Sequence, residues 1–216
     1  MAFSHDQLAD RVAPGDNALL RCPPFETAKD AGCRSLLTPD SPETENVLCV
    51  SLTRSPADYV THWRQHVDAT PAEAVIVNVD ADSDTASMDG ETQELPSCSS
   101  LTVDHVASPT NLTTIGTRLT EYLATWAEET PGRQSVFCFE SVTALLQYTT
   151  LDQTVRFLDA VTDKVADYDA IGHYHVDPGA LDPQTAQRLG TVFDDRWQFQ
   201  DGEWDGPDTD SRPPLA

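Results

Sequence analysis

The alternation of apolar and polar blocks along the chain predicts strands and helices in turn. Almost continuously apolar runs are typical of strands buried on both faces of a parallel sheet; they span residues 46–52, 74–80 and 134–141. We expect the last of these to be the central strand. Shorter or more polar runs predict further strands at 18–21, 100–107 and 170–177, and a terminal strand or hairpin at 196–204.

Between these strands, apolar residues recur with the period of an amphipathic helix. The predicted helices span residues 4–12, 28–37, 55–67, 108–129, 142–148, 151–168 and 181–195. Strands that alternate with helices predict a single α/β domain with a mostly parallel sheet and helices on both faces. In such sheets, ligands bind beyond the carboxyl ends of the strands.

The domain is expected to cover residues 1–200. Within it, residues 80–99 are polar and acidic, which predicts a long mobile loop. Residues 201–216 form an acidic, Pro-rich tail that we expect to be disordered.

Charge narrows the range of partners. The net charge is −23, from 36 acidic and 13 basic residues, of which only Lys29 and Lys164 are lysines. Such a charge predicts either disorder or a folded protein in multimolar salt, where the Debye length is ~3 Å or less. The regular apolar runs favour the folded, halophilic protein. An acidic surface argues against binding to nucleic acid or anionic membranes.

No segment has the pattern of a signal peptide or of a membrane span, so we expect a cytoplasmic protein. The five cysteines include no CxxC pair, which favours a reducing compartment without disulfides or a zinc knuckle. Cys138, within an apolar run, is expected to be buried and inert, and Cys98, in the acidic loop, to react first.

Two pairs of histidines have spacings that occur in metal sites. His173 and His175 share one face of a predicted strand and could ligate a metal together with Asp177, or hydrogen-bond at the end of the sheet. His62 and His66 lie four apart on a predicted helix, where a third ligand is lacking, so a solvated face is favoured. We therefore predict no metal site.

The stretch CPPFETAKD, residues 22–30, follows the first predicted strand, where a phosphate-binding loop would lie. A P-loop needs two glycines, a lysine and a hydroxyl residue. Aligning Lys29 with that lysine puts Pro23 and Ala28 at the glycines and Asp30 at the hydroxyl. Pro23 has no N–H to donate, and Ala28 resists positive φ. Glu26 and Asp30 also bring negative charge towards a phosphate, although a carboxylate can hold Mg²⁺.

The strand at 134–141 ends in Glu140 and Ser141. A strand-end carboxylate can orient Mg²⁺ or a water molecule, or it can simply cap the next helix.

Residues 139–199 resemble the C-terminal half of the RecA/KaiC-like ATPase superfamily, and more closely a group of small, mostly uncharacterised haloarchaeal proteins within it. The shared pattern is carried by residues 140–148, 156–158, 173–178 and 193–194. Residues 103–119 resemble the middle section of that group, and residues 14–30 occupy the place of its P-loop, so the resemblance covers most of residues 10–200.

The resemblance implies a RecA-type sheet and ancestral ATP binding. This chain departs from the family pattern at the P-loop glycines and in having Glu140 where Asp is commoner. We expect a non-catalytic regulatory or protein-interaction module without a cofactor, with Lys29, Asp30, Thr27 and Ser141 as a vestigial nucleotide site. Its partner would be another protein or further copies of itself. The alternative is slow hydrolysis of ATP with Mg²⁺, in which Lys29 contacts phosphate and Glu140 is catalytic.

Overall fold

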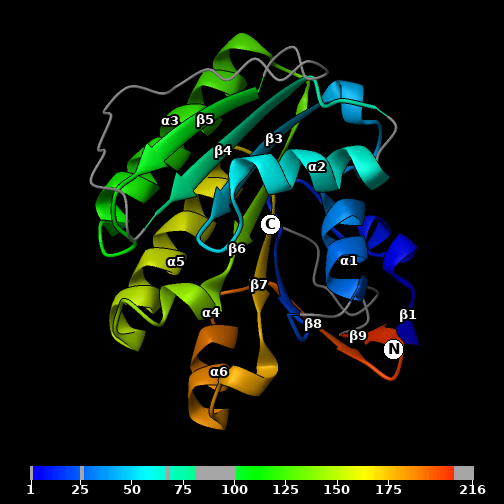
Figure 1. The fold of residues 1–216 in the computed structure, drawn as a ribbon. Helices are drawn as coiled ribbons and strands as arrows, with labels where there is room; N and C mark the ends of the chain where they lie inside the picture. The colour runs from blue at the N-terminus through cyan, green and yellow to red at the C-terminus, as the bar shows by residue number, and fades with distance from the viewer. Residues whose placement is uncertain (1, 25–26, 67–68, 81–100, 207–216) are drawn as a thin grey trace.

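The computed structural model describes residues 2–24, 27–66, 69–80 and 101–206, and within them nine strands form one sheet (Figure 1). In spatial order the strands are β1 (Ala2–Phe3), β9 (Glu203–Asp205), β8 (Asp195–Gln200), β2 (Asn17–Arg21), β7 (Ile171–Val176), β6 (Gln134–Glu140), β3 (Glu45–Ser51), β4 (Glu73–Val79) and β5 (Leu101–Val106). From β8 to β5 all strands run parallel, with β6 in the middle of them, as its apolar run predicts.

The antiparallel edge of the sheet is a hairpin of β8 and β9, against which β1 also pairs. Asp201 and Gly202 connect the two strands with φ of 53° and 90°, the positive values that a tight hairpin turn requires. The sheet therefore extends to Asp205, past the boundary expected at residue 200.

Three sequence predictions concern parts of the chain outside the described residues. These parts are the acidic loop from residue 81 onwards, Cys98 and the tail from residue 207.

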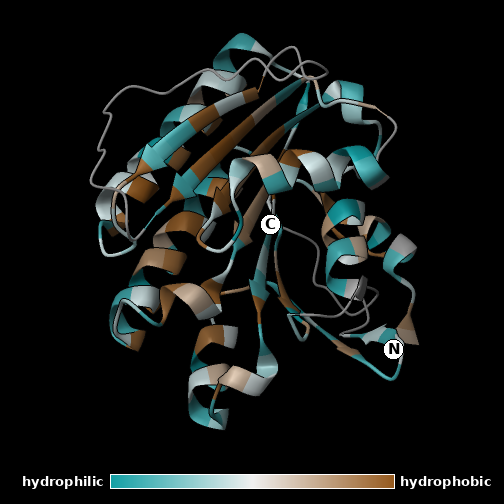
Figure 2. Ribbon diagram, viewed as in Figure 1, coloured by the Kyte–Doolittle hydropathy of each residue, from teal (hydrophilic) through white to brown (hydrophobic). Residues whose placement is uncertain are grey.

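Helices cover both faces of the sheet, as predicted. They are α1 (Thr27–Leu37), α2 (Pro56–His66), α3 (Leu112–Glu129), α4 (Val142–Leu145), α5 (Leu151–Asp167) and α6 (Pro183–Gly190), with short 3₁₀ turns at His5–Gln7, Ala9–Arg11, Pro42–Thr44 and Pro178–Ala180. Hydrophobic residues, brown in Figure 2, concentrate on the central strands, and hydrophilic residues on the outer sides of the helices. Among the described residues, no helix combines the length and apolarity that a bilayer crossing requires.

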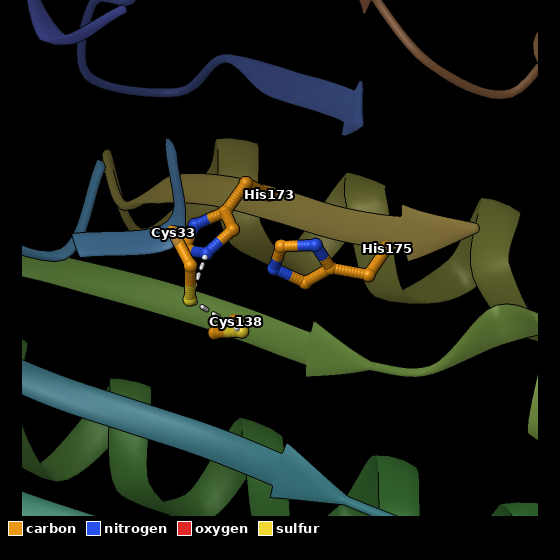
Figure 3. A group of neighbouring side chains, drawn as sticks. All are labelled: Cys33, Cys138, His173 and His175. Carbon is orange, nitrogen blue, oxygen red and sulfur yellow. Dashed lines mark hydrogen bonds between the residues drawn. The ribbon is translucent and has the colours of Figure 1, made fainter. Parts of the chain in front are cut away.

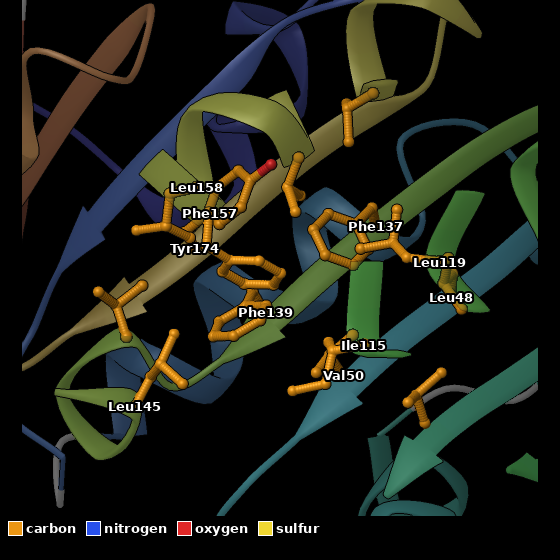
Figure 4. Packing of buried hydrophobic residues seen from close by; sticks show 14 of the residues in the cluster. Leu48, Val50, Ile115, Leu119, Phe137, Phe139, Leu145, Phe157, Leu158 and Tyr174 are labelled. Carbon is orange, nitrogen blue, oxygen red and sulfur yellow. The ribbon is translucent and has the colours of Figure 1, made fainter. Parts of the chain in front are cut away.

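One face of the sheet packs against α3 and α5. Phe137, Phe139 and Tyr174 meet there on neighbouring strands, with Phe139 stacked on Tyr174 at a centroid distance of 6.3 Å (Figure 4). The buried Tyr174 hydroxyl donates to Asn17 Oδ1 at 2.9 Å. Burial of such large aromatic side chains dominates the stability of a core.

The opposite face packs against α1, α2 and the N-terminal turns. Leu36 and Leu37 of α1 and Trp63 of α2 contact this side, together with alternate residues of the strands, including Cys49 and Cys138. Because β-strand side chains alternate between faces, Cys138 and Glu140 point to the α1 side while Phe137 and Phe139 point to the α5 side.

Local signals placed most helix ends correctly. Asp182 caps α6 by accepting from the Gln184 and Thr185 backbone N–H groups at 2.9 and 3.0 Å, with Pro183 at its start.

The helix predicted at 4–12 is instead a pair of 3₁₀ turns, with Ser4 capping the first. Such a short segment does not support a helix without extensive packing, and Leu8 is the one fully buried residue among those whose burial the structure describes in this segment.

Candidate functional site

The carboxyl end of β6 and the first turn of α1 form the centre of the candidate site. Glu140 is the last residue of β6, and Lys29 lies in the first turn of α1. Lys29 Nζ contacts Glu140 Oε1, and the two side chains are only 11% and 4% exposed. Charged groups this deeply buried need an opposite charge in contact, and each supplies it to the other.

Arg54 and Asp30 extend this pair into a cluster of four charged groups. The guanidinium of Arg54 lies between two carboxylates, 2.6 Å from Asp30 Oδ1 through Nη2 and 3.6 Å from Glu140 Oε1 through Nε. Ser51, at the end of β3, shapes the turn that carries Arg54, since its Oγ donates to the Arg54 carbonyl and accepts from its N–H. Two cations and two anions make the cluster neutral overall.

The second oxygen of Glu140 is also bonded. Tyr59 of α2 donates its hydroxyl to Glu140 Oε2 at 2.8 Å. Burial raises the pKa of Tyr59 well above its usual value, and the negative charge of Glu140 adds to this. Burial alone would lower the pKa of Arg54, but the carboxylates of Glu140 and Asp30 outweigh it and raise the pKa. Arg54 stays cationic and Tyr59 stays a donor at all physiological pH values.

The other predicted nucleotide-site residues are placed as follows. Ser141 caps α4, and its Oγ accepts from the Ala144 N–H at 3.0 Å. Thr27 begins α1, but its side chain, like all of Glu26, lies outside the described residues. Lys29 and Asp30, adjacent in the first turn of α1, take different partners: Lys29 pairs with Glu140, and Asp30 binds Arg54.

The loop that follows β2 offers few donors in its described part. The N–H of Cys22 donates to the Val176 carbonyl at 3.1 Å, and Pro23 and Pro24 have no N–H. Beside this loop lies a cavity of about 220 Å³, which Pro24, Lys29, Ser141 and His175 help to line.

The histidines of the two predicted pairs have other neighbours than the sequence suggested. Asp177 turns away to cap the turn at Pro178–Ala180, where it accepts from the Gly179 N–H at 2.8 Å. His173 and His175 point to the α1 side of the sheet instead, beside Cys33 and Cys138. His62 is not on a purely solvated face, because its Nε2 lies 3.8 Å from Asp30 Oδ2 and 3.4 Å from Arg34 Nη1. The side chain of His66 lies outside the described residues.

Residues 15–198 match the model of a protein family described as "Family of unknown function (DUF7504)". The chain belongs to this family. A search of curated protein sequences found no match for this family member.

Solved structures resemble the chain in fold. The Pyrococcus horikoshii OT3 structure titled as a structural study of PH0250 has a TM-score of 0.57 at 10% identity, covering 94% of this chain and 91% of that one. The uncharacterized protein PH0321 of Pyrococcus horikoshii, in complex with an unknown peptide, has a TM-score of 0.55 at 12% identity, covering 94% and 88%. The flagellar accessory protein FlaH of Methanocaldococcus jannaschii is also similar, with a TM-score of 0.49 at 14% identity over 94% and 82%. The member of the DUF7504 family described here thus has a RecA-like α/β fold.

Proposed function

We propose that this protein is a non-catalytic RecA/KaiC-like domain, a pseudo-ATPase, that acts as a regulatory or protein-interaction module in a halophilic cytoplasm. The proposal rests on the contacts of the Glu140 carboxylate. Both of its oxygens are engaged, one by Lys29 and Arg54 and the other by Tyr59.

The ion pair removes two groups that ATP chemistry would need. A P-loop lysine acts on the β- and γ-phosphates, and a strand-end acid orients Mg²⁺ or water. Here Lys29 and Glu140 neutralise each other. A nucleotide would have to separate Lys29 from Glu140 before it could gain either contact, so the loss of this buried ion pair offsets part of any attraction between Lys29 and phosphate.

The strand-to-helix loop supports the same proposal. Backbone N–H groups supply most of the phosphate contacts of a P-loop. In the described residues of this loop before α1, the Cys22 N–H is already bonded within the sheet, and Pro23 and Pro24 contribute none. Asp30 also holds Arg54 in an ion pair, so this second cation, like Lys29, already has a carboxylate partner.

One observation favours the alternative of an ATP-binding protein with slow hydrolysis. The cavity of about 220 Å³ adjoins Lys29, Thr53 and Ser141, so a polar ligand has some room there. This volume is below the range of about 300–1,000 Å³ that is typical of small-molecule sites. The pseudo-ATPase is therefore the better supported of the two.

An interaction role needs an apolar contact surface, and the fold has one away from the charged cluster. A groove of about 710 Å³ runs between α3 and α5, with Leu112, Phe157 and Val161 in its lining and Arg156 and Lys164 beside them. The charged residues of this lining carry both signs, Glu121 as well as Arg156 and Lys164, so the apolar side chains are what a protein partner would contact there.

Phosphate release from ATP in multimolar KCl with Mg²⁺ tests the proposal. The wild type, Lys29→Met and Lys164→Met should all show no hydrolysis above the protein-free baseline. Lys164→Met is the matched control, because it removes the other lysine, which pairs with Asp167 on the surface. Turnover in the wild type that disappears in Lys29→Met and persists in Lys164→Met would establish the ATPase alternative.

A further inference from the structure

Four potential metal ligands gather between α1 and the sheet. Cys138 of β6 lies beside His173 of β7 in the parallel register, His175 follows on the same face of β7, and Cys33 reaches down from α1 (Figure 3). The ligand atoms of all four lie within 4.8 Å of one another. Cys33 Sγ is 3.6 Å from Cys138 Sγ and 3.3 Å from His173 Nε2.

The histidines of this group are buried with polar atoms left over. His173 and His175 are 0% and 2% exposed, yet His173 Nδ1 and both ring nitrogens of His175 have no hydrogen-bond partner among the described residues. An unpartnered buried polar group costs about 1–3 kcal/mol, so native proteins seldom keep one without a purpose. A metal ion between His175 and the thiols would bond one of the two unpartnered nitrogens of His175.

We propose that Cys33, Cys138, His173 and His175 bind one Zn²⁺ ion. Two cysteines and two histidines are an established tetrahedral zinc set. With bonds of about 2.3 Å to sulfur and 2.0–2.1 Å to nitrogen, a tetrahedral site places two sulfurs about 3.8 Å apart and a sulfur and a nitrogen about 3.6 Å apart. The sulfur–sulfur distance of 3.6 Å and the sulfur–nitrogen distance of 3.3 Å differ from these by about 0.2 Å and about 0.3 Å.

Charge and access suit a buried zinc ion. Two thiolates neutralise Zn²⁺, so the filled site adds no net charge beside the neutral cluster of Lys29, Asp30, Arg54 and Glu140. Cys33 is only partly buried, whereas Cys138 is fully buried, so Cys33 is the more accessible of the two thiols. Four protein ligands leave no open position, which makes the site structural.

The site would fix the helix that carries Lys29. Cys33 lies one helical turn after Lys29, and Cys138 lies two residues before Glu140 on the same side of β6. Zinc would join α1 to β6 and β7 directly beneath the ion pair. This role is independent of the proposed function, because it holds whether or not the domain binds ATP.

Cobalt spectroscopy tests the site on the full-length protein. The protein is reduced, treated with a chelator, and titrated with Co²⁺ in high KCl. The site predicts one equivalent of tetrahedral Co²⁺ with visible ligand-field absorption and a sulfur-to-metal charge-transfer band, both lost when Zn²⁺ is added. Co²⁺ held by surface carboxylates gives neither band, which matters in so acidic a chain. Absence of the charge-transfer band would overturn the proposal.

Variants assign the ligands. Cys33→Ala and His175→Ala should weaken Zn²⁺ binding by at least the 10–100-fold that the loss of a second-shell partner causes. The control is Cys49→Ala, because Cys49 is a buried thiol on β3 paired in register with Cys138 but outside the group of four. An equal loss in Cys49→Ala, or no loss in Cys33→Ala, would refute the assignment.

Protection of the wild-type thiols gives a readout that does not depend on variants folding. Zn²⁺ should slow alkylation of Cys33, the partly exposed ligand, and leave that of Cys22 unchanged. Unchanged alkylation of Cys33, or a Cys33–Cys138 disulfide in protein isolated without reductant in place of bound zinc, would contradict the site.

Discussion

Lys29 and Glu140, which are 111 residues apart in the sequence, form a buried ion pair between the first turn of α1 and the end of β6. They differ in what else they contact. Glu140 keeps Arg54 at 3.6 Å and the Tyr59 hydroxyl at 2.8 Å, whereas Lys29 has Glu140 as its one polar partner within the described part of the chain. The two residues therefore differ in their dependence on each other. Without Glu140, the Lys29 ammonium loses its polar partner, whereas without Lys29 the Glu140 carboxylate keeps Arg54 and Tyr59.

Removing either member should destabilise the fold, and removing the acid should cost more. Glu140→Leu leaves the Lys29 charge buried, so we expect a loss of about 3–5 kcal/mol in the free energy of unfolding. Lys29→Met should cost less, because Arg54 and Tyr59 still serve Glu140. The double variant should be more stable than the sum of the two losses implies, by about 0.5–3 kcal/mol.

Denaturant unfolding at fixed KCl measures this cycle. Lys164→Met is the control, since Lys164 and Asp167 pair with side chains 45% and 57% exposed, and it should leave the free energy of unfolding nearly unchanged. Strictly additive losses for the Lys29 and Glu140 variants would mean that the pair is not coupled in solution.

Glu45, at the start of β3, should be a site where removing charge stabilises the protein. Its Oε1 accepts from the Asp40 N–H at 2.8 Å, but its buried Oε2 has no partner among the described residues. Burial raises the pKa of Glu45, so its contribution is favourable only at low pH and is lost as the pH rises through the folded-state pKa. Glu45→Gln should therefore add about 1 kcal/mol at neutral pH.

The gain from Glu45→Gln should shrink towards pH 4, where the carboxyl is mostly protonated in both the folded and the unfolded state. Glu43→Gln is the control. Glu43 is exposed, and its hydrogen bond from Ser41 lowers its pKa, so its replacement should give no gain. Chemical unfolding at pH 7 and pH 4 separates the cases, and a Glu45→Gln variant less stable at both would show that the carboxylate is well satisfied.

The net charge of −23 makes stability depend on salt. Repulsion among surface carboxylates weakens as KCl shortens the Debye length, so the melting temperature should rise through the molar range of KCl. Thermal melts across a KCl series measure this. A melting temperature that stays flat, or that is highest at low salt, would rule out the halophilic interpretation.

Sequence patterns predicted the frame of the fold because they report local physics. The apolar run at 134–141 predicted the central strand β6, and Asp182 with Pro183 marked the start of α6. The prediction that Cys138 is buried is also confirmed. The prediction of a helix at 4–12 was wrong, because this segment forms two 3₁₀ turns. Its amphipathic pattern is too short to distinguish an α-helix from such turns.

The contacts of the candidate site could be predicted only in part. Lys29 and Glu140 were both singled out, but Arg54 and Tyr59 were missed, because only the folded arrangement of the turn after β3 and of α2 brings them to Glu140. The cysteine–histidine group was missed for a similar reason. Only the adjacency of β6 and β7 places Cys138 beside His173, and no spacing along the chain encodes that register.

Calorimetric titration of ATP·Mg²⁺ into the wild-type protein in multimolar KCl tests the self-neutralised site most directly. Because the lysine and the strand-end acid already satisfy each other, we predict a dissociation constant of order 1 mM or weaker, about −4 kcal/mol. Micromolar affinity that disappears in Lys29→Met and survives in Lys164→Met would contradict this and make the protein an ATP-binding member of its family.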